Sequence, residues 1–382
     1  MTSIPFNKPY LHGRELVYIA EAVASGKISG DGVFTKRCHA FFEQRYGLAK
    51  ALLTTSCTDA LEMCALLLDI VPGDEVIVPS YTFVSSANAF VLRGAHIRFS
   101  DSLVDSPNVD PEAIRALITV RTKVIVVVHY AGIAVDMNPI MEMAAAHGIA
   151  VVEDAAQAVE STYRGRQLGT IGQLGAFSFH ETKNIIAGEG GMLAVNDPRH
   201  AGRAEIIREK GTNRSSFFRG EIDKYGWVDV GSSFLPSDII AAYLYAQLEN
   251  LQAIQARRIA IWEQYSTALA SLSAQGFESP VLPEWATNNG HMFYLVAPDL
   301  EQRSELIRRL KAEGILAVFH YVSLHSSPYF HRLHDGRALP NCDRFADGLL
   351  RLPLYYELTD VQVAHIIDRT GIHARAIAAA GA

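Results

Sequence analysis

A single lysine, Lys183, stands where an apolar run of the sequence gives way to a glycine-rich turn. The segment 175–191 reads GAFSFHETKNIIAGEGG, so the run stops at His180 and the lysine follows before the glycines. Burial at the end of a strand would disfavour the charged form of the ε-amine and make it available as a nucleophile or Schiff-base former. Taken alone, the segment also fits an ordinary solvated loop lysine, since most lysines are exposed.

A carboxylate follows a second apolar run earlier in the chain. Residues 149–153 read IAVVE, and Asp154 comes directly after them. Asp154, like Lys183, would therefore be a polar group at the end of a buried strand. The two segments together make a shared ligand site more plausible than either does alone.

The short stretch Ser56-Cys57-Thr58 lies between a strand-like run and an apolar helix. The N-terminus of a helix leaves N–H groups unpaired and carries partial positive charge, so this stretch is a candidate anion site. The alternative is a simple N-cap by Thr58, without a ligand.

Short apolar strands that alternate with helical stretches must position these groups. Continuous β-branched runs between helices indicate a largely parallel sheet covered on both faces. The expected strands are residues 75–78, 96–99, 124–128, 149–153, 176–179 and 192–195. Ligands of such sheets gather at the carboxyl ends of the strands, so residues 79–83, His129, Asp154 and residues 178–183 should converge on one rim.

The 382 residues predict a large domain at 1–250, with an N-terminal arm, and a smaller α+β domain at 251–382. The fold class is therefore expected to be α/β, a large domain with a mostly parallel sheet flanked by helices plus the small C-terminal domain. Beyond the sheet, the patterns predict helices at 14–24, 238–251, 257–270 and 303–313, strands at 291–296 and 317–321, and a helical tail. The polar loop 211–220 has the composition of an interface or lid segment.

Composition excludes several classes of protein. The formal charge of −7 comes without a basic block, which argues against nucleic acid as a partner. No run of eighteen uncharged apolar residues and no cleavable N-terminal leader is apparent, so a soluble cytoplasmic protein is expected, with no membrane partner. The cysteines form no C-x-x-C pair, and no histidine cluster has zinc spacing, so we expect no metal; the four cysteines are Cys38, Cys57, Cys64 and Cys342.

Together these groups match the needs of pyridoxal 5'-phosphate. That cofactor requires an anion site for its phosphate, a flat apolar face for its ring, a carboxylate for its pyridinium nitrogen and an amine for its aldehyde. The helix start at Ser56, an aromatic residue such as Phe83, Asp154 and Lys183 supply these in order. Each signal is weak alone, but their joint occurrence would otherwise need four independent accidents.

The same residues resemble, over nearly the whole chain, the DegT/DnrJ/StrS family of sugar aminotransferases, which are pyridoxal-phosphate enzymes of fold-type I. The family's Ser-Gly-Thr-x-Ala-Leu is similar to residues 56–61, its Glu-Asp-x-Ala-Gln to 153–157, and its Phe-Ser-Phe-His-x-x-Lys-Asn to 177–184, which Gly-Glu-Gly-Gly at 188–191 follows. Residues 79–84 and 87–89 resemble the segment that supplies the ring-stacking aromatic residue.

The resemblance implies a role for each matched residue. Lys183 would hold the aldehyde carbon of the cofactor as a Schiff base and then shuttle a proton, while Asp154 would pair with the pyridine nitrogen. Phe83 would stack on the ring and Gln157 would lie near the phenolic oxygen. The phosphate would be bound by Thr58, the Cys57 backbone N–H and Ser178.

Two positions depart from the family pattern. Cys57 stands where the family usually has glycine, so a backbone conformation with positive φ would be strained there, although its N–H would remain usable. Near residues 231–235 the family commonly has an asparagine that reaches the phosphate bound by the partner subunit. The equivalent here is the shorter Ser233, which is expected to take that place in a homodimer with shared active sites.

Within the family, residues 231–234 and 319–321 most resemble transaminases that form dTDP-4-amino-4,6-dideoxygalactose for surface polysaccharides. This implies a dTDP-4-keto-6-deoxy sugar as acceptor and glutamate as amino donor. A C3 ketone or a GDP-linked sugar stays open, as does a non-catalytic regulator that binds the cofactor. A sugar dehydratase of the family is disfavoured, because those enzymes replace the lysine with histidine. His320, Tyr321 and His325 could meet the nucleotide sugar or simply pack in a surface loop.

Overall fold

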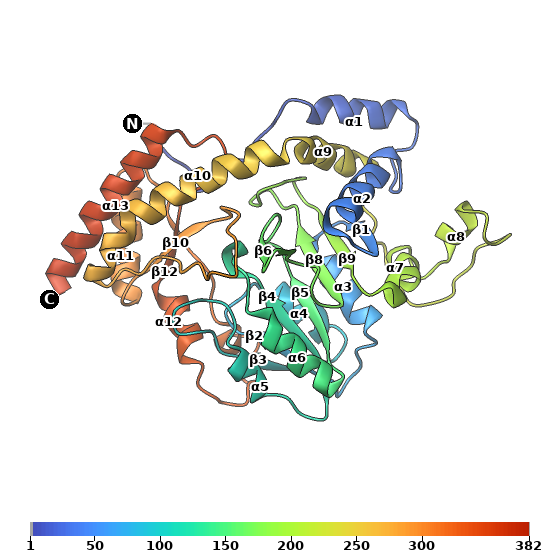
Figure 1. Cartoon of the computed structure of the whole chain (residues 1–382), viewed down its shortest axis with the longest axis horizontal. Helices are drawn as coiled ribbons and strands as arrows, with labels where there is room; N and C mark the ends of the chain where they lie inside the picture. Colours follow the sequence, from blue (N-terminus) through green and yellow to red (C-terminus); the bar gives the residue numbers. More distant parts are fainter. Residues whose placement is uncertain (1–2, 382) are drawn as a thin grey trace.

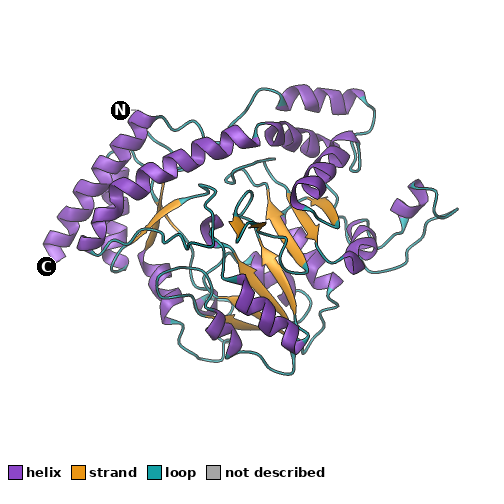
Figure 2. Cartoon of the chain, in the orientation of Figure 1, coloured by secondary structure: helices purple, strands orange, loops and turns teal. Residues whose placement is uncertain are grey.

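The computed structural model describes residues 3–381, and within that range a seven-stranded sheet occupies the centre of the molecule (Figures 1 and 2). Its strands, in spatial order, are β1 (Lys50–Thr54), β9 (Gly191–Val195), β8 (Leu174–Ser178), β5 (Ala150–Asp154), β4 (Thr122–Val128), β2 (Glu75–Pro79) and β3 (His96–Ser100). Among these strands, β9 alone runs against its neighbours, so the predicted mostly parallel sheet is confirmed.

The central strands are apolar throughout because both of their faces are covered. Along β4, Ile125 and Val127 join the core on one side of the sheet, whereas Val124 and Val126 join the core on the other. The first core packs under α1 (Glu15–Ala24), α2 (Val33–Tyr46), α6 (Met137–His147) and α9 (Asp238–Glu249). The second packs under α3 (Cys57–Leu67), α4 (Ser85–Val91) and α7 (Ala201–Arg208).

The C-terminal part of the chain builds a smaller antiparallel sheet. Its strands are β10 (Phe293–Val296), β12 (Leu349–Leu352) and β11 (Val318–Phe319), in that order. They pack against α10 (Leu251–Leu269), α11 (Leu300–Ala312) and α13 (Asp360–Gly381), which lie together at one end of the molecule (Figure 1). Helix α10 contributes Ile254 to the core of the large sheet and Ile261 to this third core, so the domain boundary at residue 250 stays a prediction.

Shorter elements complete the described chain. They are α5 (Pro111–Arg115), α8 (Arg214–Phe218), α12 (Pro340–Gly348), the hairpin of β6 (Thr162–Tyr163) and β7 (Arg166–Gln167), and the 3-10 turns at Tyr130–Gly132, Pro198–His200, Ala270–Gln275 and Leu324–Ser326. The expected loop 211–220 therefore contains a short helix, α8.

Two expectations for the C-terminal half were wrong in detail. The strand predicted at 317–321 is only the two residues of β11, because His320 turns out of the sheet and bonds through Nδ1 to the Tyr130 hydroxyl at 2.8 Å. The helix predicted at 238–251 stops at Glu249, since Asn250 adopts a non-helical φ of −106° and ψ of 10°, and α10 starts after it. The helix predicted at 257–270 starts six residues earlier, at Leu251 of α10. The other predicted strands and helices agree with the structure to within about three residues at their ends.

Candidate active site

A cavity of about 720 Å³ opens at the carboxyl ends of β2, β4, β5 and β8. Every predicted cofactor residue except Ser233 lines it, so most of the groups that sequence analysis placed on one rim meet there. The lining consists of Phe6, Thr55, Ser56, Cys57, Thr58, Leu61, Thr82, Phe83, Ser85, Val128, Asp154, Ala156, Gln157, Ser178, His180, Thr182, Lys183, Glu189, His291, His320, Tyr321 and Arg351.

The N-terminus of α3 forms one end of the cavity. Its cap is Ser56, whose Oγ accepts from the Asp59 N–H at 3.1 Å, rather than Thr58 as the alternative reading proposed. The Thr58 hydroxyl instead lies 2.8 Å from Ser85 Oγ. The first-turn N–H groups and these hydroxyls provide donors and a helix dipole suited to a phosphate group.

Cys57 carries no backbone strain. It is the first residue of α3, and it is not among the residues with positive φ in the described chain, so the strain expected from replacing the family's glycine does not arise. The close approach falls on Gly191 instead, where an added Cβ would lie 2.4 Å from the Cys57 nitrogen. A glycine at position 191 lets the end of β9 pass directly beside the helix start.

Asp154 is held rigidly at the end of β5. Its Oδ2 accepts from Ser86 Oγ at 2.7 Å and its Oδ1 accepts from the Ala156 N–H at 3.1 Å. Burial raises the pKa of this carboxyl, and these two hydrogen bonds and the charge of Lys183 oppose that rise. A cationic ring nitrogen placed beside Asp154 would favour its charged form.

Lys183 reaches the cavity from the turn after β8. Within residues 3–381 its Nζ makes no hydrogen bond or ion pair, and the turn is fixed by its backbone N–H, which donates to the His180 carbonyl at 2.8 Å. Burial lowers the pKa of the amine, the nearby Cys57 and Asp154 oppose this, and the charge of Arg351 adds to it. The amine is thus prepared to bond with a carbonyl carbon and to accept and release a proton.

Gln157 and Phe83 lie near the aromatic wall of the cavity. Gln157 Oε1 accepts from the Ala131 N–H at 2.6 Å, and its Nε2 donates to the Tyr321 hydroxyl at 3.2 Å. The Phe83 ring is 54% exposed and lies 6.0 Å from the Tyr321 ring between centroids. A free face of Phe83 is therefore available to a planar ligand.

A buried histidine and glutamate support the strand ends behind Asp154. Glu153 accepts from three backbone N–H groups, those of Gly169, Ile171 and Gly172, and lies 2.9 Å from His129 Nε2. His129 Nδ1 accepts from the Val135 N–H at 3.2 Å, so its ring proton is on Nε2 and points at Glu153. The expected rim residue His129 is therefore a structural partner of Glu153 and does not line the cavity.

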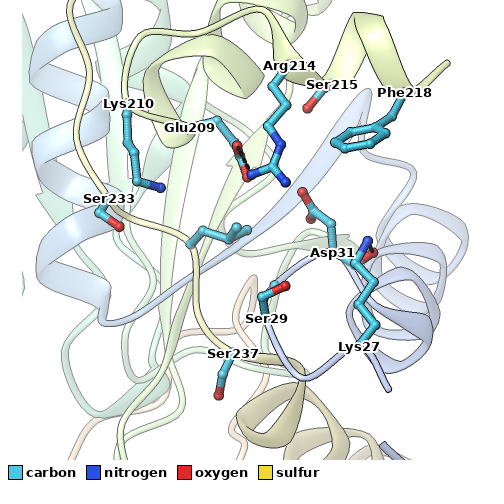
Figure 3. Close-up of a pocket in the computed structure, with 12 residues that line it drawn as sticks. Lys27, Ser29, Asp31, Glu209, Lys210, Arg214, Ser215, Phe218, Ser233 and Ser237 are labelled. Atoms are coloured by element: carbon cyan, nitrogen blue, oxygen red, sulfur yellow. Dashed lines mark hydrogen bonds and ion pairs between the residues drawn. The ribbon is translucent and has the colours of Figure 1, made fainter. Parts of the chain in front are cut away.

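Ser233 lies in a different pocket, of about 310 Å³. Figure 3 shows it facing that pocket together with Lys210, while Lys27 and Asp31 approach from the glycine-rich loop 25–32. Across from them, Arg214 of α8 forms an ion pair with Glu209 at 3.7 Å (Figure 3). Ser233 is thus not in the Lys183 cavity of its own chain, and its predicted contact with a partner's phosphate stays a prediction.

Sequence reasoning missed several residues of the cavity wall, among them Phe6, His291 and Arg351. These three come from the N-terminal segment and the small sheet, far from the cofactor motifs. One signal was available for Arg351, because it is the lone charged residue of the apolar strand Leu349–Leu352 and arginine is rarely buried without a partner. Nothing comparable marked Phe6 or His291.

The donor set fits pyridoxal phosphate. A helix N-terminus with hydroxyls, an exposed aromatic face, a buried carboxylate and a lysine with lowered pKa line one cavity. Comparison with known proteins agrees: the profile of the DegT/DnrJ/EryC1/StrS aminotransferase family matches residues 9–370. The chain belongs to the DegT/DnrJ/EryC1/StrS aminotransferase family.

Solved structures similar to this family member include aminotransferases from several bacteria. TlmJ from Streptoalloteichus hindustanus is 32% identical with a TM-score of 0.90 over 98% of this chain and 100% of that one. DesV of S. venezuelae is 32% identical with a TM-score of 0.89 over 98% and 99%. Spr1654 from Streptococcus pneumoniae, in its PMP form, is 26% identical with a TM-score of 0.90 over 98% and 100%. Spr1654 is also known in a PLP form.

The protein is therefore a pyridoxal-phosphate-dependent sugar aminotransferase. This confirms the predicted family, fold class, enzyme class and cofactor. Among the helices of residues 3–381, none combines the length and the apolar character needed to cross a membrane.

Proposed function

We propose that the enzyme transfers the amino group of glutamate to the C4 ketone of a dTDP-4-keto-6-deoxy sugar. The product would be the 4-amino-4,6-dideoxy sugar of galacto configuration, for surface polysaccharide synthesis in the cytoplasm. The observation that carries the chemistry is the convergence of Asp154, Lys183 and the α3 N-terminus on one cavity. The choice of sugar is supported by the resemblance of residues 231–234 and 319–321 to transaminases of this kind.

The chemistry of the cavity residues suggests which part of the cofactor each of them would hold. Thr58, the Cys57 N–H and Ser178 bind the phosphate, and Phe83 stacks on the ring. Asp154 accepts from the ring nitrogen. Gln157 already uses its oxygen and one amide hydrogen, so its second amide hydrogen serves the phenolic oxygen.

When bound, the cofactor supplies an electron sink for the carbon that carries the donor's amine. Lys183 Nζ would remove the proton from that carbon as a base and then, as an acid, deliver it to the former aldehyde carbon of the cofactor on the other side of the nitrogen. Its lowered pKa suits this exchange, because a neutral amine is needed for the first step. Asp154 stabilises positive charge on the ring nitrogen throughout, and its contacts with Ser86 and Ala156 hold it in place.

A homodimer with shared active sites completes the proposal. Supporting it, the segment after α7 exposes aromatic and aliphatic side chains, among them Phe218 at 67% and Trp227 at 83% of their surface. Figure 1 shows α8 projecting from the body of the molecule, next to the Ser233 pocket. In this arrangement Ser233 of each protomer serves the cofactor phosphate bound by the other.

A panel of nucleotide-linked keto sugars, each supplied with glutamate, tests the proposal. The C4 ketone of the dTDP-linked 6-deoxy sugar should be aminated with the highest kcat/KM, and the product's configuration should be galacto by NMR. A preference for a C3 ketone or a GDP-linked sugar would change the proposed substrate and leave the enzyme class unchanged. Bound cofactor that never gains an amino group from any donor would favour a regulator instead.

A further inference from the structure

His291 belongs to the wall of the active-site cavity, although the residue is only 6% exposed. It lies in the loop just before β10. Its backbone is fixed from two sides, because its N–H donates to Asn289 Oδ1 at 3.0 Å and its carbonyl accepts from Arg258 Nη2 at 2.7 Å. The residue is therefore held in one place in the cavity wall.

The hydrogen bond of Nδ1 fixes the tautomer of the His291 ring. Asn184 Nδ2 donates to the Asn289 carbonyl at 2.8 Å, and because a carbonyl only accepts, the orientation of the Asn184 amide is set. Asn184 Oδ1 is consequently the atom that lies 2.9 Å from His291 Nδ1. An amide oxygen also only accepts, so the proton of the imidazole is on Nδ1.

His291 is thus a neutral ring with a lone pair on Nε2. Burial lowers the pKa of His291 well below its ordinary value, and the charges of Lys183, Arg258 and Arg351 lower it further, so the ring takes up no second proton at neutral pH. Within residues 3–381, Nε2 accepts no hydrogen bond. A largely buried acceptor without a donor is unfavourable, so this part of the cavity suits a ligand that donates a hydrogen bond.

Few groups that enter this cavity can donate such a bond. The phosphate and the phenolic oxygen of the cofactor accept hydrogen bonds, and its protonated ring nitrogen is matched by Asp154. The carboxylates of glutamate also accept, and its amine is joined to the cofactor during transfer. Lys183 lines the same cavity and makes no hydrogen bond to Nε2 in the described chain. The hydroxyl groups of the sugar are the donors that remain.

We propose that His291 Nε2 accepts a hydrogen bond from the C3 hydroxyl of the keto sugar. This inference rests on the proposed function, in which the C4 ketone reacts beside Lys183. His291 is close enough to Lys183 for the charge of that amine to act on the ring, so the sugar atoms nearest C4 lie nearest Nε2. In a 6-deoxy sugar C5 carries a methyl group, which leaves the C3 hydroxyl as the only hydroxyl on a carbon next to C4.

His291 consequently serves one of the two half-reactions. The keto sugar has a hydroxyl for Nε2, whereas the amino donor has no group for it. The contact orients the sugar ring with C4 toward Lys183 and selects for a hydroxyl at C3. His291 gains and loses no proton in the reaction, so it is a substrate-binding residue that determines specificity.

Two variants separate the Nε2 contact from the support that Nδ1 gives to Asn184. In His291→Asn, the amide nitrogen can keep the donation to Asn184, and the acceptor at the Nε2 position is lost. In His291→Gln, the amide oxygen can reach the Nε2 position, and the bond to Asn184 is lost. His334→Asn is the matched control, since His334 Nε2 bonds to the Arg337 carbonyl and the residue does not line the cavity.

The amine form of each holoenzyme is mixed with the dTDP-linked 4-keto-6-deoxy sugar or with its 3-deoxy analogue, and return of the cofactor's aldehyde form is followed by absorbance. Loss of one neutral hydrogen bond should lower kcat/KM about five- to tenfold for the hydroxylated sugar in His291→Asn. With the 3-deoxy sugar, His291→Asn should stay within about twofold of the unmodified enzyme, because the contact is already missing. His291→Gln should recover part of the loss, and His334→Asn should show none.

Two further measurements test the fold and the binding step of these variants. The aldehyde form of His291→Asn should be converted by glutamate at the unmodified rate to within about twofold, since the donor does not use Nε2. Calorimetric titration of the amine form with the aminated product and with its 3-deoxy form should show the same dependence on the C3 hydroxyl. This titration reports binding apart from turnover.

Four results would overturn the inference. Equal losses with the hydroxylated and the 3-deoxy sugar in His291→Asn would reject the C3 contact and leave the proposed function standing. A loss with glutamate as large as the loss with the sugar would make His291 a structural support of the Lys183 turn. An unimpaired His291→Asn beside an impaired His291→Gln would assign the role to Nδ1. If the unmodified enzyme does not aminate the C4 ketone at all, the proposed function fails and the inference fails with it.

Discussion

The Lys183 cavity and the Ser233 pocket are constructed in opposite ways. Around Lys183, the polar groups follow strands of one sheet, and most are buried with hydrogen bonds that fix their direction. Around Ser233, they come from the loop 25–32 and the segment after α7, and they face a pocket between these two segments (Figure 3). Several of them, including Lys27, Lys210 and Ser233, are exposed. A single chain thus supplies the whole lining of the first cavity, to which the proposed dimer adds only the contact of the partner's Ser233. The second pocket has the character of a surface that a second chain would cover.

The difference extends to the apolar residues beside each pocket. Core residues under the Lys183 cavity, such as Val126 and Val152, are fully buried. Phe218, which lines the Ser233 pocket, and Trp227 of the same segment are largely exposed. Apolar side chains that gather on a surface can mark an interaction site. The contrast teaches that the catalytic groups and the proposed partner contacts lie on different structural elements, so that variants can disturb one without the other.

The largest expected loss of activity comes from a substitution in the Lys183 cavity. Lys183→Ala should lower the rate of amino transfer by at least about 10³-fold, because it removes both the bond to the cofactor and the proton carrier. Single-turnover absorbance with glutamate measures it. Lys8→Ala, which removes an exposed lysine paired with Glu357, is the matched control and should behave as the unmodified enzyme. Residual turnover near the original rate in Lys183→Ala would remove Lys183 from the mechanism.

Asp154→Asn should lower the same rate by about 10² to 10³-fold, since a neutral amide no longer stabilises positive charge on the ring nitrogen. The hydrogen bonds to Ser86 and Ala156 can be kept in large part, so the loss would report charge rather than misplacement. Ser86→Ala serves as the control for placement and should cost about 1 kcal/mol, or roughly fivefold. Equal effects of the two variants would contradict the assigned role of the charge.

Substitutions near the Ser233 pocket should change the assembly of the proposed dimer. Trp227→Ala should weaken the dimer by about 2 kcal/mol, which is about 30-fold in Kd, because exposed aromatic residues at interfaces carry much of the binding energy. Light scattering across a dilution series measures it. Tyr329→Ala, which removes an exposed aromatic residue far along the chain, is the control and should leave assembly unchanged. An unmodified protein that is monomeric and fully active would contradict the proposed dimer.

Ser233→Ala should have a smaller effect, about 1 kcal/mol or fivefold in cofactor affinity, through loss of one hydrogen bond to the partner's phosphate. Thr58→Ala, in the Lys183 cavity, should lower the affinity for the cofactor at least as much. Equilibrium dialysis of each variant gives the affinities. The Ser233 effect should vanish in protein diluted to monomers, and persistence there would show that Ser233 acts within its own chain.

The subtlest expected effect concerns stability. Burial raises the pKa of Asp154 in the folded, cofactor-free protein, so folding favours the protonated form. Stability should therefore fall as pH rises from the unfolded pKa through the folded pKa, and Asp154→Asn should have the higher Tm at neutral pH. Thermal unfolding measured from pH 3 to pH 8 checks this. The difference in Tm between Asp154→Asn and the unmodified protein should disappear at the acid end. A lower Tm for Asp154→Asn across the range would contradict it.

The sequence alone determined much of this protein. Alternating β-branched runs and helices indicated a parallel sheet, because a strand buried on both faces must be apolar throughout, as β4 is. Since parallel strands end at a common edge, the positions of Asp154, Ser178 and Lys183 after their strands also placed them together. Local patterns thus sufficed for these three residues, whereas His129, which follows β4, bonds to Glu153 and does not line the cavity.

Tertiary structure decided what depends on residues distant in sequence. Arg351, His291 and Phe6 join the cavity because the small sheet and the N-terminal segment fold back onto the large sheet, and no local period encodes that packing. The same holds for Cys57, whose φ is not positive, and for Gly191, whose backbone lies directly beside the Cys57 nitrogen. It also holds for Ser233, which a local match associated with the cofactor and the fold places in another pocket. Side-chain environments are set by three-dimensional contacts, so their charges and partners emerged only with the fold.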